Sequence, residues 1–177
     1  MEKLSLNDIK KMYRTSIIQD FPLPINQKLL DYLDSKKHNS YFEFGCNWGL
    51  NLKCLREEQG NVFVFGLDLS ILAIKKSMIE GIPVMYGDER LLAHFPNKMV
   101  DCVFTVSCLN HIPEEAIQEI MFNLTRIAKR EIILVESNEG KNDNWYAHDY
   151  ISYGFEPFDE IDSNGVKFIY YRLIKPL

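Results

Sequence analysis

The stretch Glu43-Phe44-Gly45-Cys46-Asn47-Trp48-Gly49 decides which fold this sequence predicts. An apolar run begins before it at Tyr41 and an amphipathic segment follows from Leu50, which predicts a strand, a turn and a helix. Gly45 and Gly49 tolerate backbone conformations that are closed to other residues, and the start of the helix presents unpaired N–H groups. We therefore expect a small polar ligand to bind at this turn.

A second apolar segment, residues 62–67, ends at Asp68. A carboxylate at the tip of a second strand suits the two hydroxyls of a ribose. The dinucleotide fingerprint G-x-G-x-x-G is absent, because Asn47 and Trp48 stand between the glycines and no phosphate cradle is evident. The two strand tips together predict a nucleoside ligand.

The turn resembles motif I of the class I S-adenosylmethionine-dependent methyltransferases, E/D-x-G-x-G-x-G, in which Glu43 supplies the acidic residue. Asn47 replaces the usual middle glycine, and asparagine accepts left-handed geometry better than most residues. The segment DCVFTVSCLNHIP, residues 101–113, is similar to the fourth strand and following loop of that family. The resemblance runs from residue 41 to 173 and extends to the small methylases associated with bacterial sugar and cell-surface biosynthesis.

This resemblance implies an α/β fold with a Rossmann-like, seven-stranded mixed sheet in the order 3-2-1-4-5-7-6 and strand 7 antiparallel. The 177 residues fit a single domain, with residues 1–38 forming helices over the cofactor site and residues 39–177 the core. The polarity pattern also predicts a short helix over 145–153 and a C-terminal hairpin whose turn is residues 162–165.

The resemblance further implies S-adenosylmethionine as cofactor and S-adenosylhomocysteine as product. Asp68 would hold the ribose, Asp88 the adenine amino group, and Tyr13 or Arg14 the methionine carboxylate. Singly, Asp68 could be a helix cap and Asp88 a turn carboxylate, but three strand tips bearing such residues together indicate a ligand site. The predicted cofactor-binding residues are Tyr13, Arg14, Glu43, Gly45, Cys46, Asn47, Trp48, Gly49, Asp68, Leu69, Asp88, Glu89, Ser107 and Asn110.

Methyl transfer from a sulfonium needs an aligned nucleophile and, for a hydroxyl or a protonated amine, a base. Histidine suits proton removal near neutral pH, and we predict His148, oriented by Asp149, ahead of His111. The alternative for the His148–Asp149 pair is a cap at the start of a helix. The alternative for His111 is a hydrogen bond within its own loop. The predicted acceptor-binding residues are Asn138, Trp145, Tyr146 and Tyr150. The alternative for the three aromatic residues is the packing face of a surface helix.

A net charge of −5 and a pI near 5.4 argue against a nucleic-acid substrate. No apolar stretch has the length of a membrane span, and the N-terminus has no signal core, so we expect a cytoplasmic protein that does not act on a membrane. The four cysteines lack C-x-x-C spacing, which predicts reduced thiols and no metal site.

The acceptor predicted from these patterns is a small polar metabolite, such as a sugar or a sugar-linked compound, methylated on oxygen or nitrogen. With no inserted cap domain, its pocket is either shallow or completed by a second subunit of a homodimer. Two other functions stay open from the sequence. One is a nicotinamide-dependent oxidoreductase, and the other is a non-catalytic protein that binds S-adenosylmethionine.

Overall fold

A computed structural model describes residues 5–14, 23–137 and 145–176 of the chain. Its strands form one sheet in the order β3-β2-β1-β4-β5-β7-β6. Strands β1 to β5 pair in parallel, whereas β7 runs antiparallel to both β5 and β6, so the predicted order and direction are confirmed. The strands are β1 (Ser40–Phe44), β2 (Phe63–Asp68), β3 (Val84–Tyr86), β4 (Val100–Val106), β5 (Ala128–Glu136), β6 (Glu156–Ser163) and β7 (Val166–Ile174).

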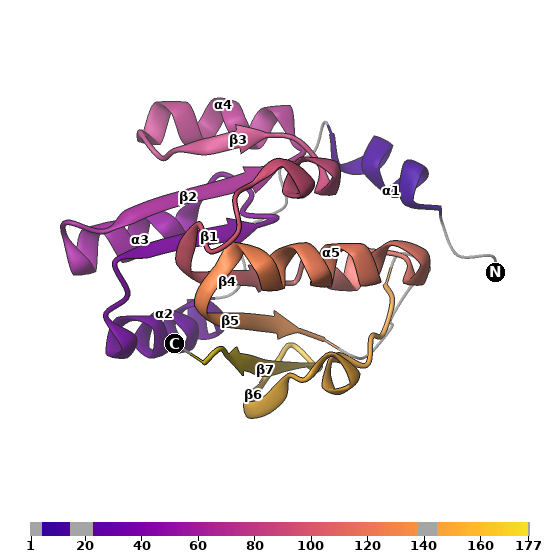
Figure 1. Cartoon of the computed structure of the whole chain (residues 1–177). Helices are drawn as coiled ribbons and strands as arrows, with labels where there is room; N and C mark the ends of the chain where they lie inside the picture. The colour runs from indigo at the N-terminus through magenta and orange to yellow at the C-terminus, as the bar shows by residue number, and fades with distance from the viewer. Residues whose placement is uncertain (1–4, 15–22, 138–144, 177) are drawn as a thin grey trace.

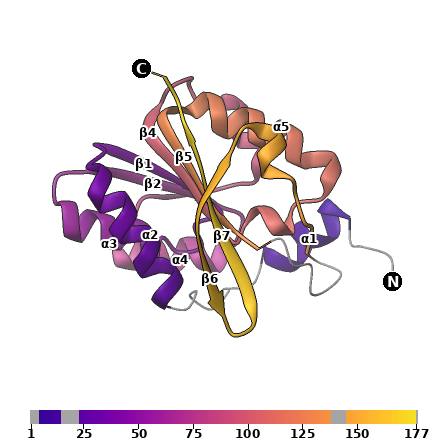
Figure 2. The same cartoon turned by 90° about the horizontal axis from the view of Figure 1, so that it is seen from below.

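Helices cover both faces of this sheet, with α5 on one face and α2 and α3 on the other (Figures 1 and 2). Helix α4 packs beside the edge strand β3. None of the helices in the described ranges combines the length and the apolar character that crossing a membrane requires. The helices are α1 (Leu6–Tyr13), α2 (Leu23–Lys36), α3 (Leu50–Gln59), α4 (Ile71–Glu80), α5 (Glu114–Ile127) and the 3₁₀ helices η1 (Glu89–His94), η2 (Leu109–His111) and η3 (Tyr150–Tyr153).

The core consists of two apolar layers separated by the sheet. Every residue of β4 is buried, as expected for a parallel strand that helices cover on both faces. Leu124 of α5 packs in the layer that contains Val103, and Leu33 of α2 in the layer that contains Phe104. Alternate residues of β4 therefore point into the two apolar layers. The loops that carry the site begin at the ends of the strands, outside these layers.

The prediction of a helix over residues 145–153 is wrong for residues 145–149. Helical structure is confined to η3, which starts where the Asp149 carboxylate accepts hydrogen bonds from the N–H groups of Ile151 (3.1 Å) and Ser152 (3.3 Å). Tyr150 is drawn into the core, where its ring lies 5.1 Å from that of Tyr171. The Asp149 cap and the burial of Tyr150 therefore place the start of the helix later in the chain than the polarity pattern predicted.

The C-terminal hairpin is present, but its turn is shorter than the predicted residues 162–165. The strands continue to Ser163 and Val166, so the connection consists of Asn164 and Gly165. Both residues have positive φ angles, 54° and 71°. This is the backbone that a two-residue hairpin turn requires, and asparagine followed by glycine is the sequence that favours it.

We predict that Gly165→Val lowers the free energy of unfolding by roughly 1–2 kcal/mol, because a β-branched side chain is strained at positive φ. Urea denaturation of the purified variant measures the loss. Asn164→Gly is the matched control and should leave stability nearly unchanged, since glycine adopts the same conformation. Equal stability of the valine variant and the wild type would contradict this account of the turn.

Candidate functional site

A pocket opens at the carboxyl ends of the parallel strands, the end beside which α1 lies (Figure 1). Its volume is about 740 Å³ including the open mouth. The loops after β1, β2, β3 and β4 line the pocket together with residues of α1. The lining residues are Leu6, Lys10, Tyr13, Phe44, Gly45, Asn47, Leu67, Asp68, Leu69, Ser70, Gly87, Asp88, Glu89, Ser107, Cys108, His111 and Ile112.

The glycine turn after β1 is held in a conformation that suits glycine and asparagine. Gly45 has a φ of 71° and Asn47 a φ of 51°. A Cβ atom on Gly45 would lie 2.2 Å from Cys108 Sγ, so the glycine is needed because the loop after β4 presses on the turn. Substitution of Gly45 would therefore disturb the packing of two loops rather than merely fill the ligand's space.

Asp68 stands at the tip of β2 with its carboxylate held by the backbone. Its Oδ2 accepts a hydrogen bond from the Asn47 N–H at 2.7 Å, and its Oδ1 accepts one from the Ser70 N–H at 2.8 Å. Burial raises the pKa of Asp68, while these hydrogen bonds oppose the rise. Each carboxylate oxygen can accept a second hydrogen bond, so Asp68 can still receive hydroxyl groups from a ligand in the pocket.

Asp88 and Glu89, at the tip of β3, are paired with α1. Lys10 Nζ lies 3.2 Å from Asp88 Oδ2 and also contacts the Glu89 carboxylate. Although burial would raise the pKa of Asp88, hydrogen bonds from Arg90 and Lys10 lower it to about 2. These buried ion pairs fasten α1 over the pocket and leave Asp88 ionised.

The loop after β4 is organised by Glu136, a residue to which the sequence assigned no individual role. Its Oε1 accepts hydrogen bonds from Thr105 Oγ1 (2.7 Å) and from the N–H groups of Cys108 and Leu109 (both 3.1 Å). Its Oε2 accepts one from the Asn110 N–H at 3.3 Å. Burial raises the pKa of Glu136 to about 7 against the opposing effect of these hydrogen bonds. In the sequence, the only indication of this role is that a glutamate stands at the end of an apolar strand.

His111 faces the pocket at the end of η2. Its Nδ1 lies 3.2 Å from the Tyr13 hydroxyl, and the two ring centroids are 5.1 Å apart. The Trp145 ring meets His111 edge-on from the other side, with centroids 5.9 Å apart. Contacts from α1 and from the segment after β5 thus fix the imidazole at the pocket wall.

His148, the base preferred from the sequence, lies outside the pocket and is 4% exposed. Its Nε2 lies 3.0 Å from the Leu109 carbonyl oxygen and 2.9 Å from that of Ile112. Its Nδ1 lies 3.1 Å from Glu114 Oε2. Since carbonyl and carboxylate oxygens accept hydrogen bonds, Nε2 is committed to holding η2, and Nδ1 contacts the first residue of α5. The geometry favours His111 over His148 as a proton acceptor, and Asp149 caps η3 instead of contacting His148's ring nitrogens.

Several other predicted site residues lie behind the pocket wall. Trp48 is buried beneath Lys76, whose Nζ lies 3.7 Å from the centroid of the indole ring. Asn110 is fully buried and donates to Ser107 Oγ at 3.3 Å. Asn138 lies outside the described residues. Besides His148, the predicted residues that do not line the pocket are Arg14, Glu43, Cys46, Trp48, Gly49, Asn110, Trp145, Tyr146, Asp149 and Tyr150.

Glu43 lies under the glycine turn and is 2% exposed. Its Oε1 accepts a hydrogen bond from Asn51 Nδ2 at 2.7 Å, but its Oε2 has no hydrogen-bond partner within the described residues. Burial raises the pKa of Glu43 to about 8 from an ordinary value of 4.5, with the Asn51 hydrogen bond opposing the rise. The chain therefore keeps a carboxyl group with an unused oxygen directly behind the site.

We predict that Glu43→Gln stabilises the ligand-free chain at pH 8 by about 1 kcal/mol or more. Between pH 4.5 and about 8 the folded chain holds a proton on Glu43 that the unfolded chain releases, so the free energy of unfolding falls as the pH rises. Glutamine is neutral, like protonated Glu43, so the variant avoids this fall in the free energy of unfolding. Urea denaturation from pH 5 to 8 measures the slope, with Glu57→Gln, on an exposed part of α3, as control. An unchanged slope in the Glu43 variant would count against the assignment.

Comparison with known proteins agrees with this architecture. The family model described as "Methionine biosynthesis protein MetW" matches residues 33–147. No curated protein matches the chain significantly.

The fold is that of the class I methyltransferases, and three solved structures illustrate it. Magnesium protoporphyrin IX methyltransferase from Synechocystis PCC 6803, with bound S-adenosylmethionine, superposes with a TM-score of 0.69 at 17% identity over 86% of this chain and 79% of that chain. An S-adenosylmethionine-dependent methyltransferase from Archaeoglobus fulgidus gives 0.69 at 17% identity over 96% and 99%. A Burkholderia thailandensis 1,6-didemethyltoxoflavin-N1-methyltransferase, with bound S-adenosylhomocysteine, gives 0.65 at 11% over 86% and 77%.

Proposed function

The chain belongs to the MetW family of methionine biosynthesis proteins, and we propose that it is an S-adenosylmethionine-dependent methyltransferase acting on a small polar metabolite. One observation carries this proposal. The tips of β1, β2, β3 and β4 bring the glycine turn, Asp68, the Asp88–Glu89 pair and His111 around a single pocket. In an open α/β sheet, this is the place where ligands bind.

The residues present fit the cofactor's three parts. Asp68 has acceptor capacity left for the ribose hydroxyls, and the Asp88–Glu89 loop lies at the neighbouring strand tip for the adenine. The turn at Gly45 and Asn47 leaves backbone exposed to the methionine portion, with Tyr13 opposite it on α1. The Synechocystis and Burkholderia proteins, which share the fold, were crystallised with S-adenosylmethionine or S-adenosylhomocysteine.

Bound S-adenosylmethionine would supply a methyl group already activated by its sulfonium. The chain's own task is then to align the acceptor and take its proton. His111 lines the pocket, and the Tyr13 hydroxyl 3.2 Å from its Nδ1 orients the ring. The acceptor's oxygen or nitrogen would take the methyl group, with the cofactor's carbon–sulfur bond as the bond broken. His111 would receive the acceptor's proton, and S-adenosylhomocysteine would be the product released.

The proposed acceptor is a hydroxylated or amino metabolite, with sugars and sugar-linked compounds included. The pocket opens at the strand tips, and its lining combines apolar residues with the polar side chains of Asp68, Ser107 and His111, which suits a compact polar acceptor. The family description, methionine biosynthesis, is compatible with a small polar acceptor. An oxidoreductase would instead require a nicotinamide dinucleotide, for which the turn lacks the middle fingerprint glycine.

We predict that Asp68→Ala weakens S-adenosylmethionine binding at least roughly tenfold, because it removes charge-assisted hydrogen bonds worth about 1.5–3 kcal/mol each. Isothermal titration of the wild type and the variant with S-adenosylmethionine, S-adenosylhomocysteine and NAD measures the affinities. Asp31→Ala, an exposed change on α2, is the control. Unaltered binding in the Asp68 variant would remove Asp68 from the site. Binding of NAD without S-adenosylmethionine would overturn the function.

We predict opposite effects for the two histidines. His111→Asn should lower turnover by roughly 10²- to 10⁴-fold with little change in cofactor affinity, the range typical of losing a general base. His148→Asn should instead lower the free energy of unfolding by about 1–3 kcal/mol, because buried carbonyl groups lose their partner. Release of S-adenosylhomocysteine with a panel of sugars, sugar nucleotides and amino acids measures turnover, and urea denaturation measures stability.

Exposed His94 provides the control substitution, His94→Asn, which should change neither quantity. Full turnover in the His111 variant would show that another group, or alignment alone, serves the chemistry. If the entire panel is unreactive while S-adenosylmethionine binds, the chain is a binding protein and not the enzyme proposed.

A further inference from the structure

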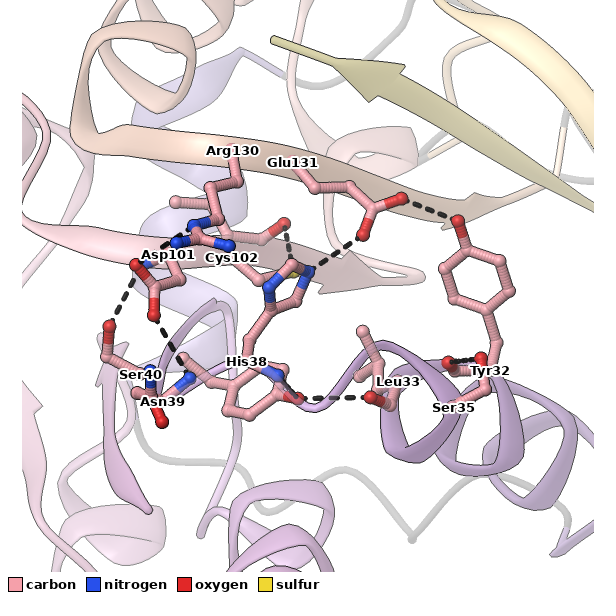
Figure 3. A network of polar contacts seen from close by, with 12 residues as sticks. Tyr32, Leu33, Ser35, His38, Asn39, Ser40, Asp101, Cys102, Arg130 and Glu131 are labelled. Atoms are coloured by element: carbon pink, nitrogen blue, oxygen red, sulfur yellow. Dashed lines mark hydrogen bonds and ion pairs between the residues drawn. The ribbon is translucent and has the colours of Figure 1, made fainter. Parts of the chain in front are cut away.

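A second polar cluster lies at the opposite end of the sheet from the pocket. It consists of His38, in the loop between α2 and β1, Cys102 near the start of β4, and Glu131 near the start of β5. Cys102 and Glu131 are register partners on adjacent strands, so their side chains project to the same face of the sheet. Figure 3 shows the His38 ring directed from its loop toward these two strands.

One ligand-type atom from each of these three residues lies within 4.8 Å of the others. His38 Nε2 is 3.0 Å from Glu131 Oε2. Ligand atoms bound tetrahedrally to zinc at about 2.0–2.3 Å are separated by roughly 3.3–3.8 Å, so small side-chain movements would suffice to enclose an ion. Imidazole nitrogen, thiolate sulfur and carboxylate oxygen are all ligands that zinc uses.

From this geometry we propose that His38, Cys102 and Glu131 form a binding site for a zinc ion, separate from the methyltransferase pocket. Thiolate and carboxylate carry two negative charges and would balance the charge of Zn²⁺ in a sheltered position. On binding, the Cys102 thiol proton leaves to solvent and His38 presents a nitrogen lone pair. Water would complete the fourth position.

The surroundings of Glu131 support a ligand role. Its second oxygen, Oε1, accepts a hydrogen bond from the Tyr32 hydroxyl at 2.5 Å (Figure 3). Such a partner fixes the orientation of a ligating carboxylate, and loss of an outer partner typically weakens metal binding 10- to 100-fold. The side chains of His38 and Glu131 are only 9% and 4% exposed, and Cys102 is fully buried.

The site would join elements that are far apart in the sequence. An ion held by all three residues would tie the end of the α2 segment to β4 and β5, close to the amino ends of the parallel strands. An ion that binds only the folded chain raises the free energy of unfolding with the logarithm of the ion's concentration relative to its dissociation constant. The proposed role is therefore structural, and it requires no cofactor in the pocket.

Cobalt titration of chelator-treated, full-length protein tests this proposal. Tetrahedral Co²⁺ bound through a thiolate gives sulfur-to-metal charge-transfer absorption, so we expect this band to saturate at an equimolar ratio and to disappear when Zn²⁺ is added. Cys102→Ala should abolish the band and weaken binding at least roughly 100-fold. Cys54→Ala, at a half-buried cysteine on α3, is the matched control and should titrate like the wild type.

Two further variants keep the test decisive if Cys102→Ala folds poorly. His38→Gln should lower cobalt affinity by a similar factor, whereas Tyr32→Phe should lower it roughly 10- to 100-fold and keep the charge-transfer band. Zn²⁺ should also raise the melting temperature of the wild type and not that of His38→Gln. No thiolate band in the wild type, or a band that persists in Cys102→Ala, would overturn the proposal, whatever the outcome of S-adenosylmethionine titrations.

Discussion

The geometry of the pocket depends on one buried carboxylate, that of Glu136 at the end of β5. Four donors converge on it, three of them consecutive backbone N–H groups that follow β4. Without this acceptor, these N–H groups would be left without partners in a buried position, which is costly. Glu136 thereby turns the chain after β4 so that Cys108 meets Gly45 and His111 faces the pocket. This close approach leaves no room for a Cβ atom at position 45, so the position requires glycine.

Helix η2 shows how separate parts of the chain cooperate around that turn. Glu136 holds its N-terminal N–H groups, and His148 holds carbonyl oxygens at Leu109 and Ile112. Tyr13 of α1 contacts His111, the last residue of η2. A three-residue helix has little stability of its own, since the first turn is the unfavourable part of helix formation. Its position is set by tertiary contacts, and these orient the imidazole before any ligand binds.

The sheet was predicted well because local patterns indicate strands that alternate with helices, because the family resemblance implies their order, and because the glycine turn with Asp68 is a contiguous signal. The roles of the histidines could not be read in this way. A sequence shows that His148 follows the fifth strand, but its carbonyl partners lie about 40 residues earlier in the chain and meet it only in the fold. The same limit left Glu136 without an assigned role. Spacing rules also miss the cluster of His38, Cys102 and Glu131, because they detect neighbouring cysteines and not residues from three distant segments.

The distribution of charge around the pocket bears on how it would distinguish substrate from product. Backbone N–H groups hold Asp68, whereas Asp88 and Glu89 are paired with Lys10. The negative charge of the pocket is therefore neutralised mainly at the tip of β3. S-Adenosylmethionine carries a sulfonium charge that S-adenosylhomocysteine lacks. In a partly buried site, a carboxylate attracts a cation more strongly than it would in water. Under the proposed function, methyl transfer removes this positive charge, so the Asp68 carboxylate would attract S-adenosylmethionine more strongly than S-adenosylhomocysteine.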